Sequence, residues 1–550
     1  FGGLDGKDRS AQSVTLSWRL GAGIVTLGLA LALTLIYLWH RERAFELHVA
    51  REAAPGPATR TVVVSSISGK SLFDLFEYFN SLFDPSTGRR CRVKGIAVVH
   101  EGAAAAAKAV TYVRYYAPIA DTCSLAMRLH RQSERTLEEI WHRRPGRTLP
   151  IRKAYVTFTR ARMRNVAVAT ANVPVCDRII NRGEGMDVRP APDPNDIIWE
   201  NLDHSTASRA ARLIATTIVL GAVAYGSFKL LVHVQQTAIL DAHGEQFALF
   251  ASAAAAVLNW ALPQAIRVAA MYVEAHRTRT GREASMLIRM VAMRVTVHVF
   301  VIFAAVSPSQ VFGLNAQASV LGRTARDLIL GDLILSNLIR FVDPYTFVVR
   351  HVLGRYLART PAQRDWFWTP PVVHIAGRYT DIFKTLIVSC TFGPIAPIVF
   401  PLSLAHFLTT HVVDRYLVTR HWRESEFLGS RVQHYARVLL LGTLLLQAAA
   451  TATLLDQWPA FEDEPPRLRE VLIAFEITLG TIALLASMYV LIQEGGLHAV
   501  RVLCLGEGEA EFFEGDEDAI GDVRDAPAYV PLDVPDWYAS VSFFEDSDSL

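Results

Sequence analysis

Nine long apolar stretches, separated by short charged segments, limit the fold of this sequence more than any other feature. A helix needs about 20 mainly apolar residues to cross the hydrocarbon core of a bilayer. The chain has 550 residues, of which 51% are hydrophobic and 20% are charged, a more apolar balance than in a typical soluble protein. We therefore predict an α-helical polytopic membrane protein. Its nine predicted spans are residues 18–39, 210–233, 247–273, 286–307, 325–347, 379–393, 395–413, 434–455 and 470–493.

Basic residues alternate from loop to loop and predict the orientation of these spans. The connections 234–246 and 308–322 contain neither lysine nor arginine, whereas the loops that alternate with them are rich in arginine. Short cytosolic loops carry an excess of basic residues. We therefore place residues 40–209 and the tail 494–550 in the cytosol, and the acidic connection 456–467 on the other side of the membrane.

The spans divide the chain into five parts. Because the sequence begins at Phe1 without a methionine, we expect the native start to lie upstream. The parts are an N-terminal fragment (1–17), the first span (18–39), a cytosolic domain (40–209), an eight-span bundle (210–493) and an acidic tail (494–550).

Short runs of β-branched residues alternate with helical patterns in the domain at 40–209. The order β-α-β-(helical insert)-β-α-β predicts a ferredoxin-like α+β sheet, which is the layout of RNA-recognition modules. Those modules stack bases on aromatic side chains of their strands, but Lys153 stands where an aromatic residue is expected. We therefore expect no nucleic acid partner and interpret Tyr155 and Phe158 as packing residues. The predicted strands are 61–65, 92–99, 154–158 and the residues around Val188, and the predicted helices are 70–83, about 103–143 and 160–171.

A proline-rich joint, residues 190–202, leads from this domain into the bundle. Each residue before a proline is disfavoured in the helical region, so the prolines at 190, 192 and 194 predict a stiff, extended connection. Trp199 follows, with an amphipathic ring of the kind found at membrane surfaces. The prolines between 379 and 413 predict a broken helix, for which a purely structural kink is an equally open interpretation. The gating or hinge candidates are Pro192, Pro194, Trp199, Pro394, Pro397 and Pro401.

The joint reads Pro-Ala-Pro-Asp-Pro-Asn-Asp-Ile-Ile-Trp-Glu-Asn-Leu. This resembles the pre-membrane signature Pro-Ala-Pro-x-Pro-x-Asp-x-x-Trp-x-Asn-Leu of the hyperosmolality-gated, calcium-permeable cation channels, the OSCA family. Residues 37–42, 61–64, 154–158 and 395–401 are similar to further segments of that family. The similarity covers essentially all of residues 18–493.

The resemblance implies an anoctamin-related channel of eleven spans that is opened by membrane tension. Each subunit is expected to hold its own pore, among the five spans that follow the cytosolic domain. Two departures stand out. The family's first two spans have no counterpart in this sequence, and Asn337 occupies a position where many members have a glutamate.

Polar residues within the predicted spans mark candidates for a pore lining, because ionisable groups in hydrocarbon normally face a cavity or a partner. Asp332 has two interpretations: a carboxylate facing permeating cations, or one half of a buried ion pair with Arg294, His298 or Lys384. Amides in the 247–273 span fit either a cavity or hydrogen bonds between helices. The pore-lining candidates are Asn259, Gln264, Asp327, Gly331, Asp332, Asn337 and Lys384.

The tail combines an acidic run, residues 507–518, with aromatic residues near its end. High charge without periodicity is typical of a solvated segment. Trp537, Tyr538, Phe543 and Phe544 are unusual in such a setting. We expect them to dock onto a partner or onto the chain's own cytosolic domain.

The sequence has no P-loop, no HExxH, no GxSxG and no spaced cluster of metal ligands. We therefore expect a protein that is not an enzyme and that holds no cofactor or metal. The expected function is a mechanically or osmotically gated cation channel, permeable to calcium, in the plasma membrane or an organelle membrane. Its expected partners are membrane lipids, permeant cations and a second copy or a larger membrane assembly. Two alternatives stay open: a lipid scramblase of related fold, and a non-conducting accessory subunit.

Overall fold

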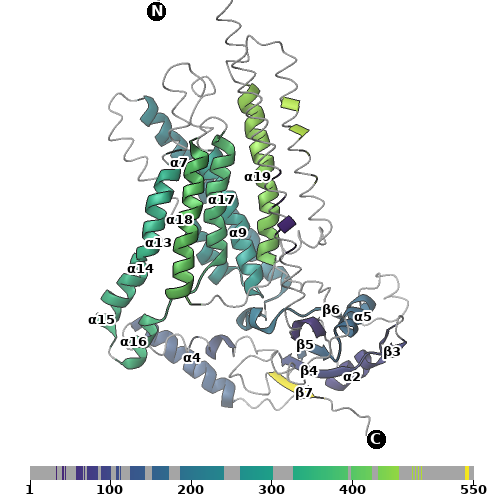
Figure 1. The fold of residues 1–550 in the computed structure, drawn as a ribbon. Coiled ribbons are helices and arrows are strands. Elements are labelled where there is room, and N and C mark those ends of the chain that lie inside the picture. The colour runs from purple at the N-terminus through teal and green to yellow at the C-terminus, as the bar shows by residue number, and fades with distance from the viewer. Residues whose placement is uncertain are drawn as a thin grey trace, which may run out of the picture.

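The computed structural model combines a bundle of long helices with a smaller α+β domain at one end of the bundle (Figure 1). The chain is mostly helical, and its sheet is small and antiparallel. Apart from a few shorter pieces, the structure describes residues 57–65, 71–84, 88–100, 124–142, 151–171, 186–202, 204–240, 261–300, 328–358, 360–393, 398–423, 431–456 and 539–543.

The α+β domain contains a sheet whose strands lie in the order β6-β1-β5-β4-β7, with antiparallel neighbours throughout. The four strands predicted from the sequence are all present, and β1 lies between β6 and β5 as a ferredoxin-like layout requires. The fifth strand comes from residues 539–543, so this segment of the tail, which includes Phe543, docks onto the chain's own domain. Trp537, Tyr538 and Phe544 lie outside the described residues. The strands are β1 (Thr61–Ser65), β4 (Val93–His100), β5 (Ile151–Phe158), β6 (Asp187–Pro190) and β7 (Ala539–Phe543), and β2 (Phe83–Asp84) and β3 (Arg89–Arg90) form a separate hairpin.

Helices α2 (Leu72–Ser81) and α5 (Ala161–Ala171) cover one face of this sheet. Helix α2 begins at a capping box, in which Ser71 and Asp74 each accept the other's backbone N–H. Phe79 is fully buried and meets the ring of Phe158 edge-on, with centroids 5.9 Å apart. Helix α4 (Ser124–His142) and the helical residues 107–110 lie within the helix predicted over about 103–143.

The joint at 190–202 covers the opposite face of the sheet. It contains the short 3₁₀ turns η3 (Pro194–Asp196) and η4 (Trp199–Asn201). Tyr155 is 1% exposed, and its ring packs edge-on against Trp199 with centroids 6.0 Å apart. Tyr155 is therefore a packing residue, as predicted, and burial raises the pKa of its hydroxyl. The ring of Trp199 is partly buried on the sheet, and its position at a bilayer surface stays a prediction.

The core of the bundle lies between α9 (Arg279–Val295), α17 (Ile375–Phe392) and α19 (Arg431–Asp456). Leu287, Met290, Phe383 and Ile387 are among its buried side chains. The elements around this core are α7 (Thr206–Leu240), the π-helical turns η5 (Ala269–Val273), η6 (Thr296–Phe300), η7 (Asp332–Ser336) and η8 (Val348–Leu353), and helices α13 (Asn337–Val342), α14 (Pro344–Phe347), α15 (Gly354–Leu357), α16 (Pro361–Trp368) and α18 (Val399–Arg420).

Helix α7 contains the stretch Ala207–Leu230. Among the described residues this is the one helix that is long and apolar enough to cross a membrane by itself. Helices α9, α17, α18 and α19 overlap other predicted spans. The nine-span arrangement itself stays a prediction, and most of the spans 18–39 and 470–493 lies outside the described residues.

The prediction of one continuous helix over 325–347 is wrong. Turn η7 begins directly after Gly331, and α13 ends at Val342, followed by Asp343, whose φ of 42° lies in the left-handed region. Aspartate tolerates this conformation better than most residues. Its carboxylate also accepts the backbone N–H of Thr346, so Asp343 ends one helix and caps the next.

Pro401 is also not the break predicted for it. It lies in the first turn of α18, where a proline costs no helical hydrogen bond. The other two prolines of that region, Pro394 and Pro397, lie outside the described residues, as do Asn259 and Asp327.

Candidate functional site

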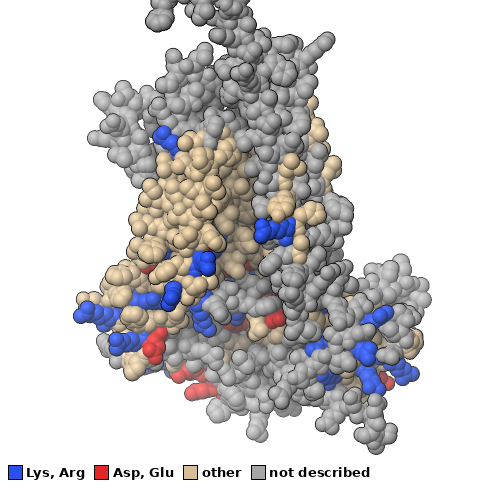
Figure 2. Space-filling model, in the orientation of Figure 1, with Lys and Arg blue, Asp and Glu red and all other residues tan. Residues whose placement is uncertain are grey.

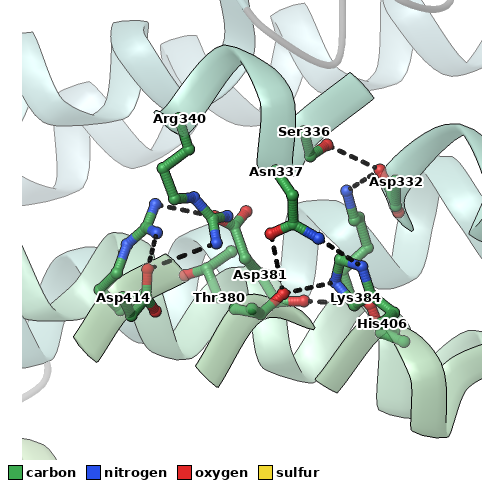
Figure 3. A network of polar contacts seen from close by, with 12 residues as sticks. Asp332, Ser336, Asn337, Arg340, Thr380, Asp381, Lys384, His406 and Asp414 are labelled. Carbon is green, nitrogen blue, oxygen red and sulfur yellow. Dashed lines mark hydrogen bonds and ion pairs between the residues drawn. The ribbon is translucent and has the colours of Figure 1, made fainter. Parts of the chain in front are cut away.

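A strip of polar side chains lies between η7–α13, α17 and α18 in the bundle (Figure 3). Three packed helices of this composition would otherwise contact one another through apolar side chains alone. The strip of polar side chains is therefore the leading candidate for a functional site. We call it the polar strip. It consists of Asp332, Ser336, Asn337, Arg340, Arg378, Asp381, Lys384, His406, Thr410 and Asp414.

Asp332 and Lys384 form an ion pair at one end of the strip. Lys384 Nζ donates to Asp332 Oδ1 over 2.6 Å, and Ser336 Oγ donates to the same oxygen over 3.2 Å. The Asp332 side chain is 13% exposed and the Lys384 side chain is 9% exposed. Asp332 is therefore one half of a buried ion pair in this conformation, which is the second of its two predicted roles. Gly331 is exposed, and a Cβ there would meet nothing within 4 Å, so it provides no close helix contact.

Asn337 connects α13 to α18 in the middle of the strip. Its side chain is buried, its Oδ1 accepts from Thr410 Oγ1 over 3.0 Å, and its Nδ2 donates to the Leu333 carbonyl over 3.0 Å. The His406 ring nitrogen Nδ1 lies 3.4 Å from the same Nδ2. Such a fully used amide supports interhelical packing in this conformation, rather than contact with a solvated path.

Two arginines and two aspartates form a second ionic group at the other end. Arg340 reaches Asp381 Oδ2 over 2.8 Å and lies 3.6 Å from Asp414 Oδ1. Arg378 reaches the same two carboxylates over 3.2 and 3.1 Å. Arg294 of α9 approaches Asp381 at 3.9 Å. Each aspartate is thus shared between arginines that come from different elements.

Sequence reasoning named Asp332, Asn337 and Lys384 but missed Asp381 and Asp414. A usable signal was present in α17, where the charged positions 378, 381 and 384 recur every three residues. Side chains at this spacing fall on one face of a helix. The candidate Gln264 lies elsewhere, with its Oε1 accepting from Arg267 over 3.2 Å.

The charges of the polar strip nearly cancel. Within the strip, Arg340, Arg378 and Lys384 face the carboxylates of 332, 381 and 414, so three positive charges meet three negative ones. Arg294, which approaches Asp381 from outside the strip, brings the sum to +1. A site with this balance does not attract a cation while its pairs are closed. It gains a free carboxylate only when a pair separates.

A second ionic cluster joins the loop that precedes α9 to helices α7 and α9. Arg289 binds both oxygens of Glu274, His276 Nε2 lies 2.8 Å from Oε2, and Thr216 of α7 donates to Oε1 over 2.8 Å. Burial alone would raise the pKa of Glu274, but the hydrogen bonds from His276 and Arg289 outweigh it and lower this pKa to about 2. Burial lowers the pKa of His276, which favours its neutral form.

The joint is fastened to this same loop. Asp196 Oδ1 accepts from the backbone N–H and the hydroxyl of Thr280, over 2.7 and 2.9 Å. The backbone N–H of Ile198 donates to the Arg277 carbonyl over 2.8 Å, and Asn201 Nδ2 donates to the His276 carbonyl over 2.8 Å. The joint therefore contacts the sheet on one side and the start of α9 on the other.

Neither a family model nor a curated protein matches this chain significantly. Within the described residues, no three side chains of the His, Cys, Asp and Glu types gather closely enough to hold a metal ion. The argument for function therefore depends on the polar strip and on the joint.

Proposed function

We propose that this protein is a mechanically or osmotically gated cation channel, with the polar strip in its permeation path. The observation that carries the proposal is a strip of paired charges between helices whose outer surfaces are apolar. The proposal includes the nine spans, the location in a membrane, calcium permeability and the relationship to the OSCA family that the sequence resembles.

The apolar outer surface supports a lipid environment for these helices. Ile334, Leu335 and Leu338, on the elements that carry Asp332 and Asn337, are each more than half exposed. In Figure 2 the described surface of the bundle carries few charged side chains along its length, and most of its lysine and arginine side chains lie near the end that faces the α+β domain. Large exposed apolar patches of this kind mark a contact with membrane or protein.

In the proposed mechanism the paired strip is the closed state. Membrane tension favours a conformation of larger area, which is a population shift driven by mechanical work. Separation of η7 from α17 breaks the pair between Asp332 and Lys384, and the freed carboxylate then raises the local cation concentration. The joint passes movements of the α+β domain to α9 through Asp196 and Thr280.

One observation favours lipid scrambling as a second candidate. The side chains of Asp381 and Asp414 are 26% and 25% exposed, respectively. A polar strip that is partly open at its side offers a path for lipid head groups. The accessory-subunit alternative has no such support among the described residues.

Purified protein in liposomes tests the proposal directly. Stretch-activated cation currents in excised patches are expected, with a conductance or selectivity that changes in Asp332→Asn. A fluorescent-lipid assay on the same liposomes gives the second readout. Scrambling without current would replace the channel by a scramblase, and the absence of both activities in folded protein would leave the accessory role.

A further inference from the structure

The tail strand β7 occupies the outer edge of strand β4. The two strands pair antiparallel over five positions, with Gly95 opposite Phe543, Ala97 opposite Val541 and Val99 opposite Ala539. In Figure 1 the yellow strand β7 lies beside β4, and β6 forms the other edge of the sheet. An unpaired edge strand presents a row of free N–H and C=O groups, and an added strand satisfies them.

The register places β7 next to the face that the joint covers. Ala97 and Val99 are buried in one apolar cluster with Ile197 and Leu202 of the joint. Directly opposed residues of antiparallel strands belong to the same sheet face. Positions 541 and 539 therefore lie on the face that holds the joint, at the border of this cluster.

From these contacts we infer that the β4 edge is a reversible docking site for residues 539–543, and that release of this strand loosens the joint. The occupant is the chain's own tail. Release leaves Ala97 and Val99 on an edge strand, with one neighbouring strand instead of two. Their packing against Ile197 and Leu202 then loses support on that side.

Two features favour the release and return of the strand. The strand is short, and a five-residue ladder on an edge contributes only the modest net strength of a few hydrogen bonds. The strand is also tethered, so its return is an intramolecular event whose effective concentration depends on the length of the connection. A tethered, weak contact of this kind exchanges between bound and free states.

Disulfide trapping in the full-length protein tests the docking. Ala97→Cys with Val541→Cys should cross-link quickly under mild oxidation, and peptide mapping should find the bridge within one chain. The matched control is Ala97→Cys with Ser542→Cys, because position 542 pairs with Ile96 and lies on the other face. Equal rates for both pairs, or a bridge between two chains in a mixture of the single variants, would overturn the inference.

Hydrogen exchange tests the effect on the joint and does not depend on channel activity. Val541→Pro removes the strand's ability to pair, because proline cannot join a ladder within a strand. Exchange in β4 and in residues 195–202 should accelerate by at least about tenfold, equivalent to the net contribution of roughly one hydrogen bond. Val541→Thr is the control and should exchange like the wild type, since threonine retains a high strand preference.

A synthetic peptide of residues 536–546 completes the test. Added to the Val541→Pro protein, it should restore the slow exchange of β4 and the joint, whereas a scrambled peptide should not. Faster exchange in β4 alone would show that the tail docks without affecting the joint, and this would refute the second half of the inference. Lack of restoration at millimolar peptide, a concentration comparable to the effective concentration that a flexible tether provides, would refute the claim that docking is reversible.

Discussion

The ion pair between Asp332 and Lys384 makes the sharpest prediction about the polar strip. Both side chains are almost fully buried, and their contact distance is 2.6 Å. Removing one partner of a buried ion pair typically costs about 3–5 kcal/mol, because the other charge stays buried without compensation. Asparagine at 332 retains an acceptor for the lysine, so we expect Asp332→Asn to lower the free energy of unfolding by about 3 kcal/mol, the lower end of this range.

The double variant tests whether the loss of stability comes from the unpaired charge of Lys384. Lys384→Met removes the orphaned charge, and the combination with Asp332→Asn should return to within about 1 kcal/mol of the wild type, since a buried pair and an apolar replacement are often nearly equal in stability. Denaturant unfolding in detergent micelles, followed by circular dichroism, measures the four proteins of the cycle. Independent sites add within about 0.5 kcal/mol, so a coupling energy below this value would refute the pairing.

Glu134→Gln in α4 is the matched control for that cycle. Glu134 Oε2 lies 3.3 Å from His130 Nδ1, but the Glu134 side chain is 48% exposed. Exposed pairs on a helix contribute about 0.3–0.5 kcal/mol. A loss as large as that of Asp332→Asn would show that the assay responds to any carboxylate and does not measure burial.

Three further predictions concern topology, the joint and the cluster at Glu274. A tag inserted in residues 456–467 should react with an impermeant reagent on intact cells, and labelling only after permeabilisation would reverse the predicted orientation. Pro192→Gly combined with Pro194→Gly should shift the tension needed for opening at normal expression, because it softens the joint; an unchanged activation curve would make the joint a passive linker. The pKa of Glu274 is lowered from 4.5 to about 2 in the folded protein. Its stabilisation, about 3 kcal/mol, is therefore present above pH 4.5 and lost as the pH falls towards 2. Denaturant unfolding of Glu274→Gln should lack this part of the pH dependence, and parallel pH profiles for the two proteins would contradict it.

Local sequence patterns predicted the α+β domain well because its strands and helices carry their own signals. Residues 61–65 are a buried strand as predicted, and the prolines did identify a joint between two parts of the molecule. The contact between the Trp199 ring and Tyr155 was missed, because an amphipathic ring can lie in more than one apolar environment and the sequence does not select among them. The prediction of a continuous helix over 325–347 missed the π-helical turn η7 and the break at Asp343 for a related reason. Both depend on contacts that no local pattern encodes.

The polar strip shows more clearly what local sequence patterns cannot predict. Asp332 could be paired with any of three cations by sequence, and the choice of Lys384 follows from how η7 and α17 pack. Asp381 and Asp414 escaped attention because each lies close to the end of an apolar stretch, where a charged residue is ordinarily taken as an anchor. Their sharing of Arg340 and Arg378 is a three-element arrangement, beyond the reach of any single-helix pattern.

The position of the joint on the sheet has a thermodynamic consequence for anything that binds there. Ile197 and Trp199 occupy the face on which RNA-recognition modules of the same layout present their binding residues, so a ligand can reach Tyr155 only after displacing them. Displacement also strains the hydrogen bonds that tie Asp196 and Ile198 to the start of α9. Such coupling is reciprocal. A ligand that displaces the joint would favour the movement of α9 away from it. A force that moves α9 away from the joint would in turn raise the affinity of the sheet for that ligand, by the same factor.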